Sequence, residues 1–127
     1  MPQDYVQAVK LYRLAADQGY ARAQTSIGTM YASGHGVPQD DVQAVKWFRL
    51  AADQGHARAQ FNLGVMYEFG RGVPKDYALA YMWLNLAAAG ESTARENAVK
   101  ARDALATMMA PAQIAEAQRM SREWKPK

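Results

Sequence analysis

The sequence predicts an all-α fold, a right-handed α-α superhelix of about seven antiparallel helices stacked as a solenoid. Two observations lead to this prediction. Pro2, Pro38 and Pro74 open three similar stretches, so the chain repeats with a period of 36 residues. Apolar residues within each unit recur at helical spacing. A period of this length is typical of arrays in which each unit buries its apolar face against its neighbours.

The first two copies are residues 2–37 and 38–73, and they differ at eleven of 36 positions, which leaves 25 identical. Identical positions are those that every unit needs for its own fold and for stacking, whereas differing positions are free to serve another role. The differing pairs are 5/41, 11/47, 12/48, 20/56, 25/61, 26/62, 27/63, 29/65, 32/68, 33/69 and 35/71.

A helix is expected to begin near Asp4 and another near Asp40, because each aspartate is followed three residues later by glutamine, the spacing of a capping box. Apolar residues at i, i+3, i+4, i+7 and i+8 then predict one broad buried stripe on each helix. The stripes are Ala8, Leu11, Tyr12, Ala15 and Ala16 in the first copy, and Ala44, Trp47, Phe48, Ala51 and Ala52 in the second. Gly19 and Gly55 predict the helix ends.

A second helix in each unit is expected to begin near Ala21 and Ala57. Gly28 and Gly64 lie inside these helices, where glycine costs about 1 kcal/mol relative to alanine. Their recurrence predicts that a neighbouring helix approaches the backbone too closely for a Cβ. We expect the ring of Tyr12 or Trp47 to be the neighbour.

The third copy diverges after Pro74, as is typical of a terminal unit. Ala94, Ala98, Ala101 and Leu105 predict a helix over about 93–108. Pro111 suits the first position of a further helix, so residues 111–124 are interpreted as a capping helix.

Two stretches, AVKWFRLAADQG at residues 44–55 and AQFNLGVMYEFGRGVPKDY at residues 59–77, resemble the Sel1-like repeat (SLR) branch of the tetratricopeptide repeats. The resemblance covers residues 2 to about 90. It implies a single solenoid domain over 1–127, with whole repeats at 20–55 and 56–90. Residues 1–19 would then be the second helix of a truncated repeat, and 91–127 a degenerate repeat with its capping helix.

Composition narrows the class of protein. The net charge is only +3, and 15 basic residues are interspersed with 12 acidic ones, so no basic stripe that would track nucleic acid is visible. No apolar run approaches the roughly 20 residues that cross a bilayer, which predicts a soluble protein without membrane contact. The chain has no cysteine, hence no disulfide or zinc knuckle. Neither a cofactor nor a metal is expected, and the compartment, cytoplasmic or periplasmic, stays open.

Five of the differing positions, 25/61, 26/62, 29/65, 32/68 and 33/69, fall on one face of the second helix of each unit. Resemblance to tetratricopeptide repeats implies that this face lines a concave groove for a peptide or partner protein. Arg22, Arg58, Asn62 and Lys100 could hold a carboxylate or the backbone of that partner. The candidate residues are Arg22, Thr25, Thr29, Arg58, Phe61, Asn62, Val65, Glu68, Phe69 and Lys100. The alternative is that Phe61 and Phe69 pack against the helices that follow.

A catalytic function is not predicted. His35 and His56 have no recurrent acidic partner, and Ser26, Ser33 and Ser92 have no base that the sequence identifies. The alternative is a small-ligand-binding or hydrolytic protein related to β-lactam chemistry, since some cysteine-rich relatives in the SLR family have been linked to penicillin binding. This chain lacks their paired cysteines, so a non-catalytic scaffold is favoured.

The N-terminal helix, about residues 4–18, is expected to leave an apolar edge uncovered because no unit precedes it. We expect this edge to include Val6, Val9 and Leu14. Exposed apolar edges favour association, so a homodimer through this helix is a possible partner arrangement.

Overall fold

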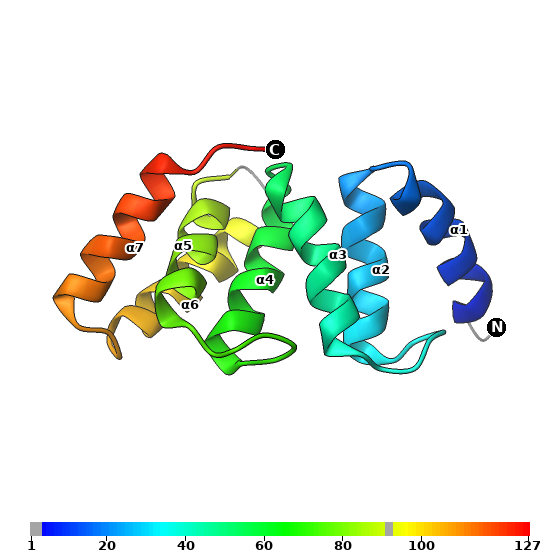
Figure 1. Ribbon diagram of the computed structural model, residues 1–127, viewed down its shortest axis with the longest axis horizontal. Coiled ribbons are helices and arrows are strands. Elements are labelled where there is room, and N and C mark those ends of the chain that lie inside the picture. Colours follow the sequence, from blue (N-terminus) through cyan, green and yellow to red (C-terminus); the bar gives the residue numbers. More distant parts are fainter. Residues whose placement is uncertain (1–3, 91–92) are drawn as a thin grey trace.

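The structure is a computed structural model that describes residues 4–90 and 93–127. Within that part of the chain it contains seven helices and no strand (Figure 1). The helices are α1 (Tyr5–Asp17), α2 (Ala21–Ser33), α3 (Asp41–Asp53), α4 (Ala57–Phe69), α5 (Tyr77–Ala88), α6 (Ala94–Ala106) and α7 (Pro111–Glu123). Helices α1 to α5 follow one another as a row of antiparallel neighbours, α6 packs on α5 and α4, and α7 packs on α5 at the end opposite α1. The predicted all-α solenoid is therefore confirmed.

Aspartate side chains begin the three helices that follow the prolines, as the capping pattern predicts for Asp4 and Asp40; Asp76 does the same without a glutamine three residues later. Each carboxylate accepts a hydrogen bond from a backbone N–H three residues later, which satisfies one of the donors that a helix start leaves free. Asp4 accepts from Gln7 at 3.0 Å, Asp40 from Gln43 at 3.2 Å and Asp76 from Leu79 at 3.0 Å. Gly19 and Gly55 follow the ends of α1 and α3 with φ of 92° and 90°, a region that favours glycine.

Gly28 and Gly64 let the next helix approach closely. A Cβ built on Gly28 would lie 2.7 Å from the Phe48 ring, and one on Gly64 would lie 2.8 Å from Cγ of Leu84. The close approach is therefore confirmed, but the expected neighbours, Tyr12 and Trp47, are wrong. The contact comes from the helix that follows in the chain, α3 or α5, because α2 packs on α3 and α4 on α5.

The buried stripe is confirmed for α3 but only in part for α1. Trp47 is 5% exposed, whereas Leu11 at the equivalent position is 60% exposed, and Tyr12 is also exposed. The reason is the number of neighbours. Trp47 of α3 fills a cluster with Ala16 of α1 and Ile27 of α2, the two helices that precede it, whereas no described helix precedes α1 to cover Leu11.

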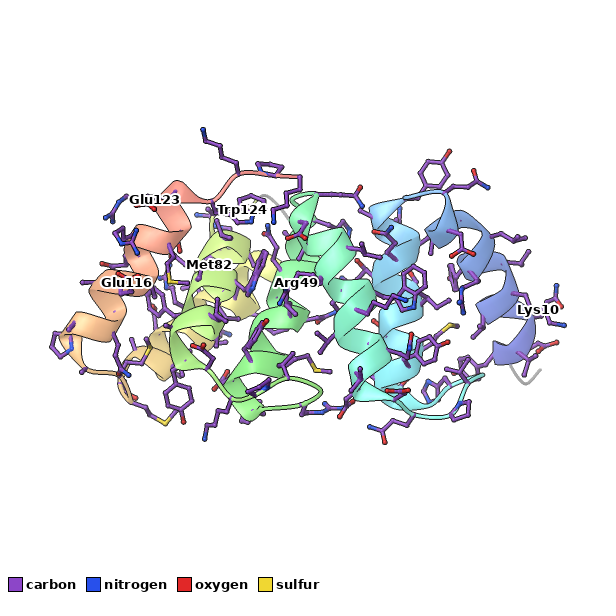
Figure 2. All side chains as sticks on the ribbon, viewed as in Figure 1. Lys10, Arg49, Met82, Glu116, Glu123 and Trp124 are labelled. Carbon is purple, nitrogen blue, oxygen red and sulfur yellow. The ribbon has the colours of Figure 1, made fainter. Side chains whose placement is uncertain are left out.

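Helix α7 covers the outer side of α5, against which it packs through the buried Ala117. Trp124, just after α7, meets Trp83 of α5 edge to face, with ring centroids 6.0 Å apart. Figure 2 shows Glu116 and Glu123 on the outer side of α7, where Arg119 bonds to both of them. The polar outer face and apolar inner face fit the predicted capping helix.

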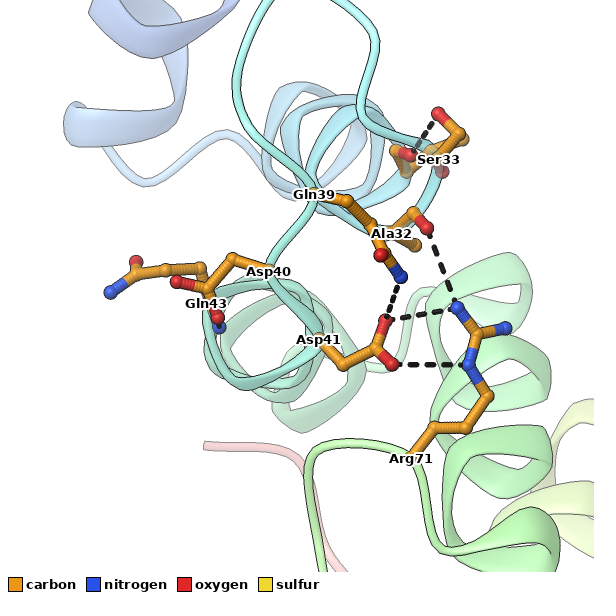
Figure 3. A network of polar contacts seen from close by, with 8 residues as sticks. Ala32, Ser33, Gln39, Asp40, Asp41, Gln43 and Arg71 are labelled. Carbon is orange, nitrogen blue, oxygen red and sulfur yellow. Dashed lines mark hydrogen bonds and ion pairs between the residues drawn. The ribbon is translucent and has the colours of Figure 1, made fainter.

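The loop after α2 contacts the first residue of α1, and the loop after α4 contacts the first residue of α3. The side chains that make these contacts differ between the two copies. Arg71 Nη2 and Nε lie 2.9 and 3.2 Å from the Asp41 carboxylate oxygens (Figure 3). At the equivalent positions His35 stacks on Tyr5, with ring centroids 4.6 Å apart. The pairs 5/41 and 35/71 therefore differ together because their side chains touch.

Candidate partner-binding groove

A groove runs across α1, α2, α4 and α6, and it consists of three adjoining cavities. The largest, of about 730 Å³, lies over α1 and α2 and reaches the start of α4. The second, of about 360 Å³, lies between α2, α4 and α6, and the third, of about 170 Å³, lies between α2, α3 and α4. Thr29 lines all three cavities, and Arg58 joins the first to the second. We refer to the three together as the groove.

Seven of the ten candidate residues lie in the groove. They are Arg22, Thr25, Thr29, Arg58, Phe61, Asn62 and Val65. The other three, Glu68, Phe69 and Lys100, line none of its cavities. Phe69 is the last residue of α4 and is 64% exposed, and Lys100 is exposed on α6. Glu68 is half-buried, and burial raises the pKa of its carboxyl against the opposing effect of Lys75.

Thr25 belongs to the floor of the groove. Its side chain is only 3% exposed, and the hydroxyl donates to the carbonyl of Ala21 at 3.0 Å. Because that bond uses its one hydrogen, the hydroxyl accepts from Nδ1 of His56, 2.9 Å away. Thr25 therefore positions His56, and its own side chain has little surface left for a partner.

Phe61 belongs partly to the groove and partly to the core. It is half-buried and packs against two clusters of buried residues, one of them formed by Ala87, Ala88 and Ala98. It also lines the second and third cavities. One side of Phe61 therefore supports α6, as the core interpretation expects. Another side is open to the groove, where the binding interpretation places a partner.

Ten residues of the largest cavity were not among the candidates, and five of them carry aromatic rings and lie outside the predicted helix face. Tyr5, Tyr12, Tyr20, His35 and His56 come from the helix starts, from α1 and from a loop, outside the helix face on which the sequence reasoning concentrated. All five occupy positions at which the two copies differ. The comparison of the two copies therefore already marked these residues as variable, but only the structure shows that they line one cavity.

Positive charge dominates the groove. Within the described part of the chain no aspartate or glutamate lines any of its cavities. Arg22 and Arg58 are exposed at its edge, whereas Arg71 is paired with Asp41. The pKa of His56 is lowered, first by burial and then by the nearby charges of Arg58 and Arg22. The groove is therefore an environment that favours an anionic ligand group.

The serines of the groove do not form a nucleophile with a base. Ser26 and Ser33 donate to carbonyls of their own helix, those of Arg22 and Thr29, at 3.1 and 2.8 Å. Contrary to the sequence expectation, a histidine does lie near Ser33, with Nδ1 of His35 at 3.2 Å. Because the Ser33 hydrogen is already used, His35 acts there as a donor. Ser92 lies outside the described residues.

The described residues contain neither a metal-binding cluster nor a membrane-spanning helix. Over residues 4–90 and 93–127, no group of three or more His, Cys, Asp or Glu residues could hold a metal ion. Across the same residues, every helix is too short or too polar to cross a membrane.

Comparisons with known proteins identify relatives of the chain. Residues 1–20, 21–56 and 57–92 match the family model described as Sel1 repeat. A protective antigen of uropathogenic Escherichia coli strains, which displays an SLR fold, is similar at 30% identity and a TM-score of 0.91, over 98% of this chain and 27% of that one. A Sel1 repeat protein from Oxalobacter formigenes is similar at 42% identity and a TM-score of 0.67, over 68% of this chain and 25% of that one.

The chain thus spans about a quarter of the length of either structure, 27% and 25%. No curated protein matches its sequence.

Proposed function

Because this chain belongs to the Sel1 repeat family, we propose that it is an interaction module whose groove binds a peptide segment of a partner protein, without catalysis of its own. Sel1 repeats commonly mediate protein–protein interaction, and scaffolds built from them are generally non-catalytic. The binding mode in the groove is our proposal.

One observation carries the proposal: the positions that differ between the two copies converge on the groove. In a repeat array, stacking requires the shared positions, so differing positions are those available for recognition. The residues of the first copy that differ and line the largest cavity are Tyr5, Tyr12, Tyr20, Thr25, Ser26, Thr29, Ser33 and His35. Two of the remaining three positions, Leu11 and Ile27, lie outside the groove, and Ala32 lines the third cavity.

The groove also has the properties that a peptide site needs. Its walls are helices whose packing is fixed by the core, so little ordering is required on binding. The second and third cavities combine the apolar surface of Phe61 and Val65 with the amide of Asn62. Apolar pockets select side chains, and polar groups can bond to the backbone of an extended segment or to a helix laid in the groove.

A matched pair of threonine variants tests the proposal. Thr29 and Thr107 are both exposed, and each hydroxyl donates to a carbonyl of its own helix, but only Thr29 lines the groove. Peptides would first be selected from a displayed random library against the unmodified chain, and their dissociation constants would be measured by fluorescence anisotropy. We expect Thr29→Tyr, which fills the groove, to weaken binding at least about tenfold and Thr107→Tyr to leave it unchanged. Equal affinity of the parent and Thr29→Tyr would contradict the proposal, as would a selection that enriches no peptide.

A further inference from the structure

We propose that the groove recognises an acidic peptide, with a carboxylate of the peptide held between Arg22 and Arg58. The inference rests on the proposed function and specifies the chemistry of the partner. It starts from two side chains that recur at the same place in successive units. Both line the largest cavity, Arg22 from the first turn of α2 and Arg58 from the first turn of α4.

The recurrence of this arginine is not explained by stacking. Within residues 4–90 and 93–127, the side chains of Arg22 and Arg58 make no hydrogen bond or ion pair, and both are exposed. By contrast, five other arginines bond to carboxylates, amides, carbonyls or tyrosine hydroxyls of the fold: Arg13, Arg49, Arg71, Arg102 and Arg119. Arg22 and Arg58 therefore occupy shared positions of the repeat without contributing a polar contact to its structure.

The charge of these two arginines is not compensated in the groove. All carboxylates of the described residues lie outside the three cavities, and the Asp41 carboxylate near the third cavity is bound by Arg71. An anionic group that enters between α2 and α4 would therefore meet two guanidinium groups and no repulsive charge. Arginine binds carboxylates with paired, charge-assisted hydrogen bonds, which are stronger than bonds between neutral groups.

His56 indicates that both positive charges act on the same point. It is the residue before α4, it lines the largest cavity, and Thr25 fixes its ring through Nδ1. Besides burial, the charges of Arg58 and Arg22 lower the pKa of this histidine. A carboxylate placed there would be attracted by both arginines and would raise the pKa of His56 again.

A peptide fits the groove better than a nucleic acid does. Single-stranded nucleic acids are bound by a track of basic residues along the backbone and by aromatic rings on which bases stack. Here the two unpaired arginines line one cavity, and the adjoining second and third cavities are lined by Phe61, Asn62 and Val65. This arrangement suits a carboxylate followed by an apolar side chain and a backbone amide.

Three fluorescent peptide pools of equal length and equal apolar content provide the probe. Their variable positions carry Asp and Glu in the first pool, Asn and Gln in the second, and Lys and Arg in the third. We expect the acidic pool to bind at least about tenfold more tightly than the neutral pool. We also expect Arg22→Gln and Arg58→Gln each to reduce the affinity for the acidic pool about tenfold, with little effect on the neutral pool.

Arg122→Gln is the control because it changes the net charge by the same amount at an exposed site on α7 that lines no cavity. Its affinity for the acidic pool should equal that of the parent. Another outcome is binding of the neutral pool that Thr29→Tyr abolishes and the arginine variants leave unchanged. That result would overturn this inference and leave the proposed function intact. Binding of no pool would overturn both. Tighter binding of an oligouridylate than of the acidic pool would identify a nucleic-acid site and would also overturn it.

Discussion

At the scale of single residues, glycine decides how closely successive helices pack. Gly64 faces Leu84, and a carbonyl of the next helix, that of Ala80, would lie 3.2 Å from a Cβ at this position. A backbone atom cannot move aside as the end of a flexible side chain can. The cost of glycine in a helix is therefore offset by the packing that it permits.

Gly64→Val should destabilise the fold by more than a change in helix propensity. We expect a loss of about 1–3 kcal/mol or more from overpacking, because the side chain of Leu84 and the backbone of α5 would both have to shift. Thr29→Val is the control, since Thr29 is exposed and should change stability by less than about 0.5 kcal/mol. Thermal melts measure both. Equal losses in the two variants would show that the faces of α2 and α4 are assigned wrongly.

His56 should make the stability of the fold depend on pH. Its pKa in the folded state is lowered by burial, by Arg58 and by Arg22, so the unfolded chain binds a proton more readily. The free energy of unfolding should therefore fall as the pH decreases through the unfolded pKa of about 6.5. We expect His56→Gln to show a smaller decrease than the parent between about pH 7.5 and pH 5.5 in urea titrations. An identical decrease in both proteins would contradict this.

At the scale of the elements, sequence patterns predicted the helices well and their burial less well. Capping aspartates and glycine stops are local signals, so the predicted boundaries of α1 to α4 agree closely with the structure. Burial also depends on neighbours, which periodicity does not contain. Leu11 and Trp47 occupy equivalent positions of the same pattern, yet only Trp47 lies between two helices.

The groove was predictable only where it follows one helix face. Spacing along the second helix of each unit places Thr25, Thr29 and Asn62 together without knowledge of the fold. Nothing in the spacing brings Tyr5 from one helix start and His56 from another to the same cavity. These contacts depend on how α1, α2 and α4 are placed relative to one another, which the sequence alone does not specify.

The same N-cap should matter differently in α1 and α3. Asp4 and Asp40 make equivalent hydrogen bonds, but α3 is packed on both sides and α1 on one. We expect Asp40→Ala to reduce the free energy of global unfolding by about 1 kcal/mol. Asp4→Ala should instead mainly accelerate hydrogen exchange of the amides of α1, because a one-sided helix opens locally. Equal effects of both variants on global unfolding would contradict this difference.

At the scale of the whole molecule, α1 carries four of the nine exposed large apolar side chains of the described residues: Val6, Leu11, Tyr12 and Leu14. The sequence assigned this edge to Val6, Val9 and Leu14, but the structure modifies the assignment. The counterparts of Val6 and Leu14 in the second copy, Val42 and Leu50, are exposed even within the stack. The large side chains that change are Leu11 and Tyr12, whose counterparts Trp47 and Phe48 are buried, and of these two Tyr12 also lines the groove.

If α1 mediates self-association, Leu11 should control it and Leu14 should not. Light scattering over a dilution series would measure the mean mass. We expect the mass of the parent to rise with concentration, Leu11→Glu to stay monomeric and Leu14→Glu to behave as the parent. A strictly monomeric parent at every concentration would show that this surface does not bind a second copy.

The resemblance drawn from residues 44–55 and 59–77 is confirmed by the family model and by both solved structures. The resemblance predicted the fold correctly because the residues that define the repeat motif also pack its helices together. Gly64 and the buried Leu63 and Met66 are examples. The partner recognition proposed above depends on residues that line the groove, most of which differ between the copies. Membership in the family therefore predicts the scaffold more securely than the ligand.

The position of α5 has a consequence for the order in which the chain folds. Helix α5 contacts α4, α6 and α7, and it supplies Ala80, Tyr81, Trp83 and Leu84 to the largest buried cluster. In a linear array folding can nucleate in any unit and then propagate, and we expect the nucleus where one element gains several interfaces at once. Residues 57–123 should therefore contain the folding nucleus, and α1, with one interface to gain, should be the last helix to condense. Order would in that case spread from the C-terminal helices of these residues toward α1.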